Sequence, residues 1–259
     1  MAQAVQAGGW TRRLSALALA LSVGGLVAAL VAAVGSGAGA WPFGTGFGIL
    51  RWAFYAAVAG GVLAIVAFVM SRRTGVRTGA SNLAALIVAL LFGGYLLSHV
   101  ATARSVPAIH DVTTDLDDMP QFRTLTVRAD NLEMIPDMDR PELAAMDPLN
   151  RWKEIHREAY GDVGPIRLNA RPADALRRAE ALARERGWAV AKVDPVSGTV
   201  EATATTLFFR FKDDVVVRVR PDPERPGGSV VDMRSISRVG GSDVGVNAER
   251  IRDFLKDLA

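Results

Sequence analysis

The hydrophobic pattern of the chain changes sharply near residue 101. Three apolar runs precede this point, Leu14–Val34, Ile49–Met70 and Leu83–Ala101, each of about 19 to 22 residues. About 20 helical residues cross the hydrocarbon core of a bilayer. The segments between the runs contain Gly, Pro, Ser and Thr, which are typical of loops. The pattern therefore predicts three transmembrane helices within residues 1–101.

After the third run the pattern becomes that of a soluble domain. Prolines recur through residues 102–147 and predict an extended, loop-rich approach, whereas residues 148–259 predict a folded core. In this core, apolar spacings of three and four predict helices, and spacings of two predict strands. The predicted helices are 148–160, 172–187 and 248–258, and the predicted strands are 188–193, 199–205, 207–211, 215–220 and 229–237.

Alternation along the strands separates two faces of the predicted sheet. One face is apolar: Val200, Ala202, Ala204, Val215, Val217, Val219, Val231 and Met233. The other is polar: Glu201, Thr203, Thr205, Arg210, Arg218, Arg220, Asp232 and Arg234. Short connections between consecutive strands indicate an antiparallel meander, and amphipathic helices can cover its apolar face. The predicted fold class is an α-helical membrane anchor followed by a two-layer α+β soluble domain with a mainly antiparallel sheet.

The charges divide at the same place as the hydropathy. Residues 1–101 contain six arginines and no lysine or acidic residue. All 27 Asp and Glu lie in residues 102–259, where 24 Lys and Arg leave a net charge of −3. The overall charge of +3 thus comes from the spans, so it does not indicate nucleic-acid binding. The absence of cysteine excludes disulfides, cysteine-ligated zinc and thiol nucleophiles.

The arginines that flank the spans predict their orientation. Five lie on one side of a three-span protein and two on the other: Arg12, Arg13, Arg72, Arg73 and Arg77 against Arg51 and Arg104. By the positive-inside rule the N-terminus is cytoplasmic and the C-terminal domain is periplasmic or otherwise extracytoplasmic. In an alternative interpretation the first run is a twin-arginine signal peptide cleaved at Ala38-Gly39-Ala40, although the run is long for a signal. The later spans keep their orientation in either case.

A Gly-Gly pair lies near the middle of each predicted span. The pairs are Gly24-Gly25, Gly60-Gly61 and Gly93-Gly94. Glycine allows helix backbones to approach closely, which is a main source of helix association in lipid. Two interpretations remain open at this level, tight packing of the three helices on one another and a glycine face that receives another subunit.

The candidate binding residues lie on the polar sheet face and at the corner that follows it. Around Val231–Arg250 a strand, a glycine-containing loop and a helix N-terminus follow in order, and Asn247 is a plausible N-cap. Free backbone N–H groups at such a corner, with arginine side chains, can bind an anion. In the alternative, cross-strand ion pairs occupy the arginines and Asp243 pairs with one of them. The anion- or partner-binding candidates are Arg210, Arg218, Arg220, Arg234, Ser237, Arg238, Asp243, Asn247 and Arg250.

The sequence contains no coherent catalytic or metal-binding motif. No Gly-x-Ser-x-Gly elbow is present, and His156 falls on the apolar face of a predicted helix, which favours a packed, hydrogen-bonded histidine. The acidic stretch His110–Asp118 lacks the glycine and the terminal glutamate of an EF-hand, so we interpret it as a structural turn. We therefore predict no catalytic residue, no metal ligand and no cofactor.

Two segments carry a resemblance to a known family. Val200–Val219 and Val231–Ile251, together with Ile109–Asp115, closely resemble the bacterial family called domain of unknown function 1499, in its membrane-anchored members. The resemblance covers about residues 105–258. It implies a bacterial protein and supports the domain boundaries, and the family name implies no activity.

These observations lead to one main hypothesis and two alternatives. The main hypothesis is a non-enzymatic, multi-pass protein of the bacterial inner (cytoplasmic) membrane. Its spans lie in the lipid bilayer, and its periplasmic α+β module binds a membrane or envelope protein or an anionic ligand. The first alternative is an envelope enzyme for a phosphorylated or acidic substrate, with Arg234, Arg238 and Arg250 as an anion clamp and Asp243 or His156 as base. The second is an accessory subunit of a larger membrane complex.

Overall fold

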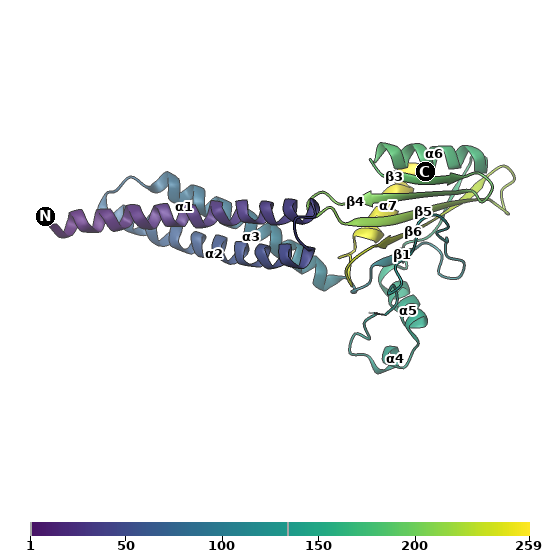
Figure 1. Ribbon diagram of the computed structural model, residues 1–259, viewed down its shortest axis with the longest axis horizontal. Coiled ribbons are helices and arrows are strands. Elements are labelled where there is room, and N and C mark those ends of the chain that lie inside the picture. The colour runs from purple at the N-terminus through teal and green to yellow at the C-terminus, as the bar shows by residue number, and fades with distance from the viewer. Residues whose placement is uncertain (1, 134) are drawn as a thin grey trace. The chain divides into compact units, whose positions relative to one another are not determined.

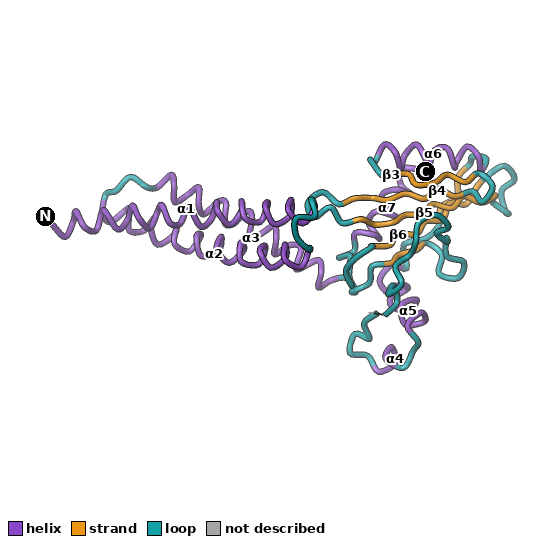
Figure 2. Tube along the Cα trace, in the orientation of Figure 1, coloured by secondary structure: helices purple, strands orange, loops and turns teal. Residues whose placement is uncertain are grey.

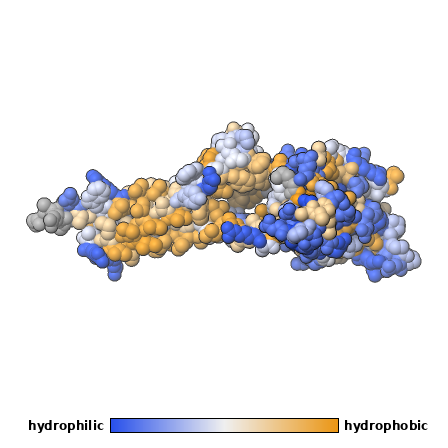
Figure 3. All heavy atoms as spheres, turned by 90° about the horizontal axis from the view of Figure 1, so that it is seen from below, coloured by the Kyte–Doolittle hydropathy of each residue, from blue (hydrophilic) through white to orange (hydrophobic). Residues whose placement is uncertain are grey.

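Three long helices form the first of two compact units in the computed structural model, which describes residues 2–133 and 135–259 (Figure 1). They are α1 (Ala2–Gly37), α2 (Phe43–Thr74) and α3 (Gly79–Ser105). Each is long and apolar enough to cross a membrane. Figure 3 shows apolar side chains over most of the surface of these helices, as expected for contact with lipid. Three long apolar helices are thus confirmed where the sequence predicts three spans.

The Gly-Gly pairs bring the three helices into close contact. A Cβ added at Gly25 would lie 2.6 Å from the backbone oxygen of Ala53. One added at Gly61 would lie 2.9 Å from the Cβ of Ala89. Side chains larger than hydrogen would therefore force the helices apart. In contrast, Gly24 and Gly94 have no neighbour within 4 Å of an added Cβ. One glycine of the first pair and one of the third thus face outward from the bundle.

The second unit, residues 102–206 and 211–259, is built on an antiparallel sheet (Figure 2). Its strand order is β1-β6-β5-β4-β3, and β2 pairs with a second stretch of β6. The strands are β1 (Asp111–Thr113), β2 (Ile166–Leu168), β3 (Ala189–Asp194), β4 (Thr199–Thr205), β5 (Lys212–Pro221) and β6 (Ser229–Ser237). The helices of this unit are α4 (Pro141–Ala144), α5 (Pro148–Tyr160), α6 (Pro172–Glu185) and α7 (Val246–Leu258).

The main core lies between the sheet and the two helices α6 and α7 (Figure 1). All eight residues assigned to the apolar sheet face are buried. They meet the apolar stripes of α6 and α7, and the rings of Trp188 and Phe254 stack at a centroid distance of 5.1 Å. The predicted fold class, a helical anchor and an α+β domain with an antiparallel sheet, is confirmed.

Three local predictions were wrong. Leu207–Phe211 was predicted as a strand, but residues 206–211 form the loop between β4 and β5. The predicted turn Lys212-Asp213-Asp214 lies inside β5 and pairs with β4, because Arg250 and Arg238 neutralise the buried carboxylates of Asp213 and Asp214. Asn247 does not cap α7, whose N-cap is Gly245 in the left-handed conformation. The sequence analysis also missed the short strands β1 and β2.

Each edge of the sheet is protected against pairing with another chain. At one edge, the indole N–H of Trp152 on α5 donates to the Asp111 carbonyl at 3.0 Å. The backbone N–H of Thr113 donates to Nε2 of His156 at 3.1 Å. At the other edge, β3 contains a register shift near Val190 and presents Lys192. Side-chain caps, bulges and edge lysines all prevent strand addition, so the edges do not favour recognition by β-augmentation.

Candidate functional site

The polar face of the sheet is covered by the chain itself. We call residues 115–131 the covering segment. Its backbone N–H groups at Arg123, Thr124 and Leu125 donate to the carboxylate of Glu201 on β4 at distances of 2.7 to 3.1 Å. Glu201 is fully buried by these contacts. A carboxylate held by several N–H donors satisfies its charge without a cation. The face predicted to be open or solvated is therefore an internal packing surface at this point.

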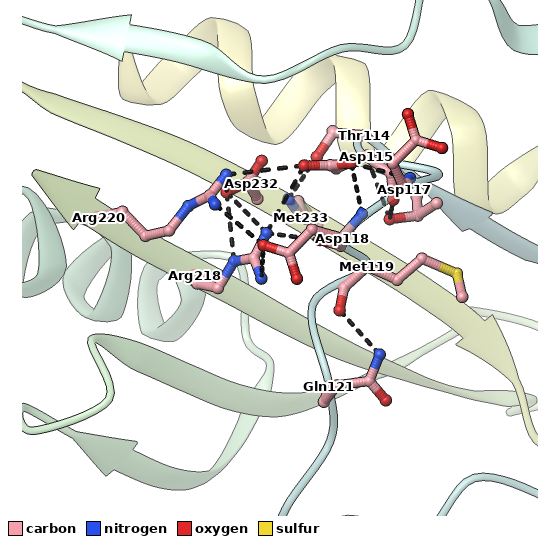
Figure 4. Close-up of polar contacts among 11 residues, drawn as sticks. Thr114, Asp115, Asp117, Asp118, Met119, Gln121, Arg218, Arg220, Asp232 and Met233 are labelled. Atoms are coloured by element: carbon pink, nitrogen blue, oxygen red, sulfur yellow. Dashed lines mark hydrogen bonds and ion pairs between the residues drawn. The ribbon is translucent and has the colours of Figure 1, made fainter. Parts of the chain in front are cut away.

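Arginines and aspartates fix the start of the covering segment to the sheet (Figure 4). Arg218 and Arg220 on β5 point toward Asp232 on β6, with N–O distances of 3.2 and 2.8 Å. Both arginines also reach Asp118 at 3.0 Å. Burial raises the pKa of Asp232, and the two guanidinium groups act in the opposite direction. The acidic stretch forms a turn in which Asp115 accepts from the N–H groups of Asp117 and Asp118, as the structural-turn interpretation predicted.

Arg234 forms the most deeply buried ion pair of this face. Its guanidinium contacts both carboxylate oxygens of Asp111 on β1, at 2.9 and 2.6 Å. The second oxygen of Asp111 also accepts from the amide of Asn131, whose oxygen lies 3.1 Å from Nε2 of His110. The ring of Phe122 covers the guanidinium at 5.8 Å. Arg234 is thus enclosed by its partners and by the covering segment.

Arg238 pairs with one carboxylate but remains accessible. It makes two hydrogen bonds with Asp214, at 2.9 and 2.8 Å, and one with the Thr203 hydroxyl at 3.1 Å. The pair with Asp214 raises the pKa of Arg238. The side chain of Arg238 is nevertheless 41% exposed, and that of Arg220 is 40% exposed. These two are the candidate arginines of the sheet that solvent reaches most.

A separate polar cluster lies on the opposite face, beneath the start of α7. Arg250 donates to Asp213 at 2.6 Å and to the Ser235 hydroxyl at 2.9 Å. Asn247 accepts from the same hydroxyl and donates to the Ser237 hydroxyl at 3.0 Å. Alternation places Asp213, Ser235 and Ser237 on the face that carries the valines. This cluster therefore closes the end of the helix-covered core.

Two predicted site residues have other roles. Asp243 accepts from the backbone N–H groups of Gly245 and Asn247 at 2.8 and 2.7 Å, so it caps the turn before α7 and forms no ion pair among the described residues. Burial raises its pKa, and the two N–H groups oppose that shift. Arg210 lies outside the sheet, in the β4–β5 loop, with a φ of 58°. The prediction that placed Arg210 on the sheet face was wrong because its strand does not exist.

The predicted anion corner is not a single site. Arg234 and Arg238 lie on the covered face, whereas Arg250 lies under α7 on the other face. Each of the three contacts a different aspartate. Sequence reasoning missed these three pairs, because nothing in a local pattern tells which of 27 acidic residues meets a given arginine. It placed Glu201 on the polar face but could not show that a distant segment covers it.

His156 is a buried, neutral histidine at the β1 edge of the sheet. Among the described residues no cluster of three or more His, Asp or Glu is placed to hold a metal ion. Burial lowers the pKa of His156 to about 4, so the imidazole that accepts from Thr113 is neutral near pH 7. A cavity of about 480 Å³ lies beside the α2–α3 connection, with Arg72 and Arg77 in its wall. None of the candidate site residues lines this cavity.

Comparison with known proteins identifies the family of the soluble domain. The model of the family described as "Protein of unknown function (DUF1499)" matches residues 111–258. The chain belongs to the DUF1499 family. The match begins at β1 and ends at the last residue of α7, so the family domain includes the covering segment as well as the sheet. No curated protein matches the chain.

Proposed function

We propose that this DUF1499 protein is a non-catalytic binding protein of the bacterial inner membrane. Three spans anchor it, and its periplasmic α+β domain binds an anionic group of a partner protein or of an envelope component. One observation carries the proposal: Arg220 and Arg238 keep about two fifths of their side chains exposed, while Arg234 and Arg250 are buried. Arg220 lies near the end of β5 and Arg238 contacts Asp214 near its start, so they act as two separate contact points and not as one clamp. A guanidinium group has five N–H donors, so an exposed arginine can bind an incoming carboxylate or phosphate while its buried aspartate partner stays in place.

The positions of arginine around the spans support the periplasmic orientation. Arg72 and Arg73 lie in the last turn of α2, and Arg77 lies in the connection to α3. Arg12 and Arg13 belong to the same predicted side, and positive residues of short loops are retained in the cytoplasm.

The absence of cysteine allows a direct test of orientation. A single thiol at Val196→Cys, in the β3–β4 turn, should react with a membrane-impermeant maleimide in intact spheroplasts. A thiol at Ala80→Cys, at the start of α3, should react only after lysis. The reverse labelling pattern would place the domain in the cytoplasm and contradict the proposal.

The contacts of the proposed enzyme residues favour binding over catalysis. An anion clamp needs Arg234, Arg238 and Arg250 to converge, but they lie on two faces and contact three aspartates. Of the two candidate bases, Asp243 accepts from two backbone N–H groups and His156 from one. A general base must reach a substrate proton, which these occupied groups do not.

Native mass spectrometry of the full-length protein, released gently from its own membrane, tests the proposal. We expect a reproducible bound mass that is lost in the double variant Arg220→Gln with Arg238→Gln. The matched control is Arg177→Gln with Arg184→Gln, because these arginines are exposed on α6 and pair only within that helix. A wild-type protein without bound mass, or equal loss in the control, would contradict the assignment.

An accessory subunit is the second candidate, and the outward-facing glycines favour it. Gly24 on α1 and Gly94 on α3 leave open space where an added Cβ would stand. Small residues on an exposed helix face permit close approach of another span. Substitution Gly24→Leu should then release a co-purifying membrane protein, whereas retention of that protein would count against this candidate.

A further inference from the structure

The β4–β5 loop exposes large apolar side chains, which a soluble domain normally buries. Leu207 is 79% exposed and Phe208 is 47% exposed. The loop is nonetheless well defined. The Thr206 N–H donates to the Phe211 carbonyl, and the Phe211 N–H donates to the Thr206 hydroxyl, both at 2.9 Å. A closed four-residue loop with exposed large apolar residues indicates an interaction site rather than a failure of folding.

The strand register shows which end of the sheet carries this loop. Asp111 on β1 and Asp214 on β5 both pair with Ile236, and Asp214 also pairs with Thr203 on β4. These four residues therefore form one row across the sheet. The linker from α3 reaches the sheet at this row, because β1 begins at Asp111. The β4–β5 loop lies just beyond the row on the same side, because β4 ends at Thr205 and β5 begins at Lys212. The end of the sheet that receives the chain from the third span is thus the end that carries the loop.

The tether between the third span and the sheet is short. Only five residues separate Ser105, the last residue of α3, from Asp111. At about 3.3–3.6 Å per extended residue, this linker spans at most about 20 Å. Leu207 follows Thr203 by four residues, so the loop extends about 13 Å from the row in the direction of the linker. Ile109 and His110 are buried in the domain, so the free part of the linker is only Val106–Ala108, about 11 Å when extended. The loop therefore projects on the side of the linker and over a similar length.

The chemistry of the loop matches a bilayer surface. Two phenylalanines and a leucine are followed by Arg210 and Lys212. Apolar side chains enter the boundary between headgroups and acyl chains, and cations next to them contact lipid phosphates.

We propose that the β4–β5 loop inserts Leu207 and Phe208 into the lipid interface and acts as a second membrane contact of the α+β domain. This contact restrains the domain relative to the bilayer, whereas the linker alone would let it rotate. The inference requires the membrane anchor but not the binding function proposed above, so each can fail without the other.

Site-directed spin labelling of the full chain tests this contact. The label is attached to Leu207→Cys in a bilayer nanodisc of phosphatidylethanolamine and phosphatidylglycerol. The matched control is Val196→Cys, because Val196 is an apolar residue, 98% exposed, in the turn at the opposite end of the sheet. Collisions with oxygen and with a water-soluble nickel chelate measure how deeply each label enters the lipid.

We expect the ratio of oxygen to nickel collisions to be severalfold higher at position 207 than at position 196. Equal ratios would place the loop in water and overturn the proposal. Low collision rates with both reagents, with an immobilised label, would show contact with protein and would also overturn the lipid assignment. If the melting temperature of Leu207→Cys is lower than that of the wild type, the label is placed at Phe208→Cys instead, with the same expected and contradicting outcomes.

Discussion

The two faces of the sheet are both largely covered by other parts of the chain, but different forces hold the two covers in place. On the helix face, valines and alanines of β4, β5 and β6 pack against α6 and α7. On the other face, the covering segment binds through carboxylates and guanidinium groups, as at Glu201 and Arg218. Apolar packing is non-directional and tolerates changes of similar volume, whereas a buried ion pair loses most of its value when one partner is removed. The domain therefore depends on individual residues more strongly on its polar face.

Removal of one partner of the Arg234–Asp111 pair should have the largest effect. The variant Arg234→Met leaves the Asp111 carboxylate buried without a cation, which destabilises a fold by about 3–5 kcal/mol. Urea unfolding followed by tryptophan fluorescence measures this loss. The control Arg184→Met removes an exposed arginine and should change stability by less than about 0.5 kcal/mol. Equal stability of the two variants would mean that the pair contributes no more than a surface contact.

The pH dependence of the unfolding free energy tests the contact of His156 with Thr113 at the β1 edge, which involves a neutral imidazole and no ion pair. The folded pKa of His156, about 4, lies below the unfolded value of about 6.5. The unfolded chain therefore binds the proton more readily, and stability falls as pH falls from about 6.5 to 4. The full effect is of the order of 3 kcal/mol.

The control for this titration is His156→Gln. Glutamine keeps an acceptor for the Thr113 N–H but does not titrate in this range. The difference in unfolding free energy between wild type and variant should therefore change between pH 7 and pH 4.5. A constant difference would show that His156 has the same pKa in the folded and the unfolded chain, as an exposed histidine does.

The hydrogen bonds of Glu201 should contribute less than the Arg234 pair, because no buried cation is left behind. In Glu201→Gln, an NH₂ group replaces one of the two oxygens that accept from residues 123–125. We expect a loss of about 1–3 kcal/mol and faster proteolysis within the covering segment. Unchanged proteolysis would mean that other contacts hold the segment.

The smallest effect is expected at Arg238. The guanidinium of Arg238 is 41% exposed although the Asp214 carboxylate is buried, and glutamine can still donate to that carboxylate, so Arg238→Gln should reduce stability by about 1 kcal/mol. The loss should shrink further in high salt, because exposed charges are screened. A loss as large as that of Arg234→Met would make Arg238 structural and remove the main support for the proposed binding function.

The same contrast explains how much the sequence predicts. Helical spacing predicts the exact bounds of α5, and the alternation of Val215, Val217 and Val219 predicts the helix face. The polar face could not be predicted, because Asp111 meets Arg234 across more than a hundred residues. Likewise, the Phe-rich loop looks like a strand by composition. Its exposure follows only from the register of Thr205 with Lys212.

Hydrogen exchange at Arg123, Thr124 and Leu125 tests most directly whether the covering segment closes the polar face. In the full-length protein in nanodiscs, the amides that donate to Glu201 should exchange nearly as slowly as those of β4. They should exchange much faster in Glu201→Gln, while β5 and β6 remain protected. Exchange at the rate of an unstructured peptide in the wild-type protein would contradict the account, since the arginine-bearing face would then be open to solvent.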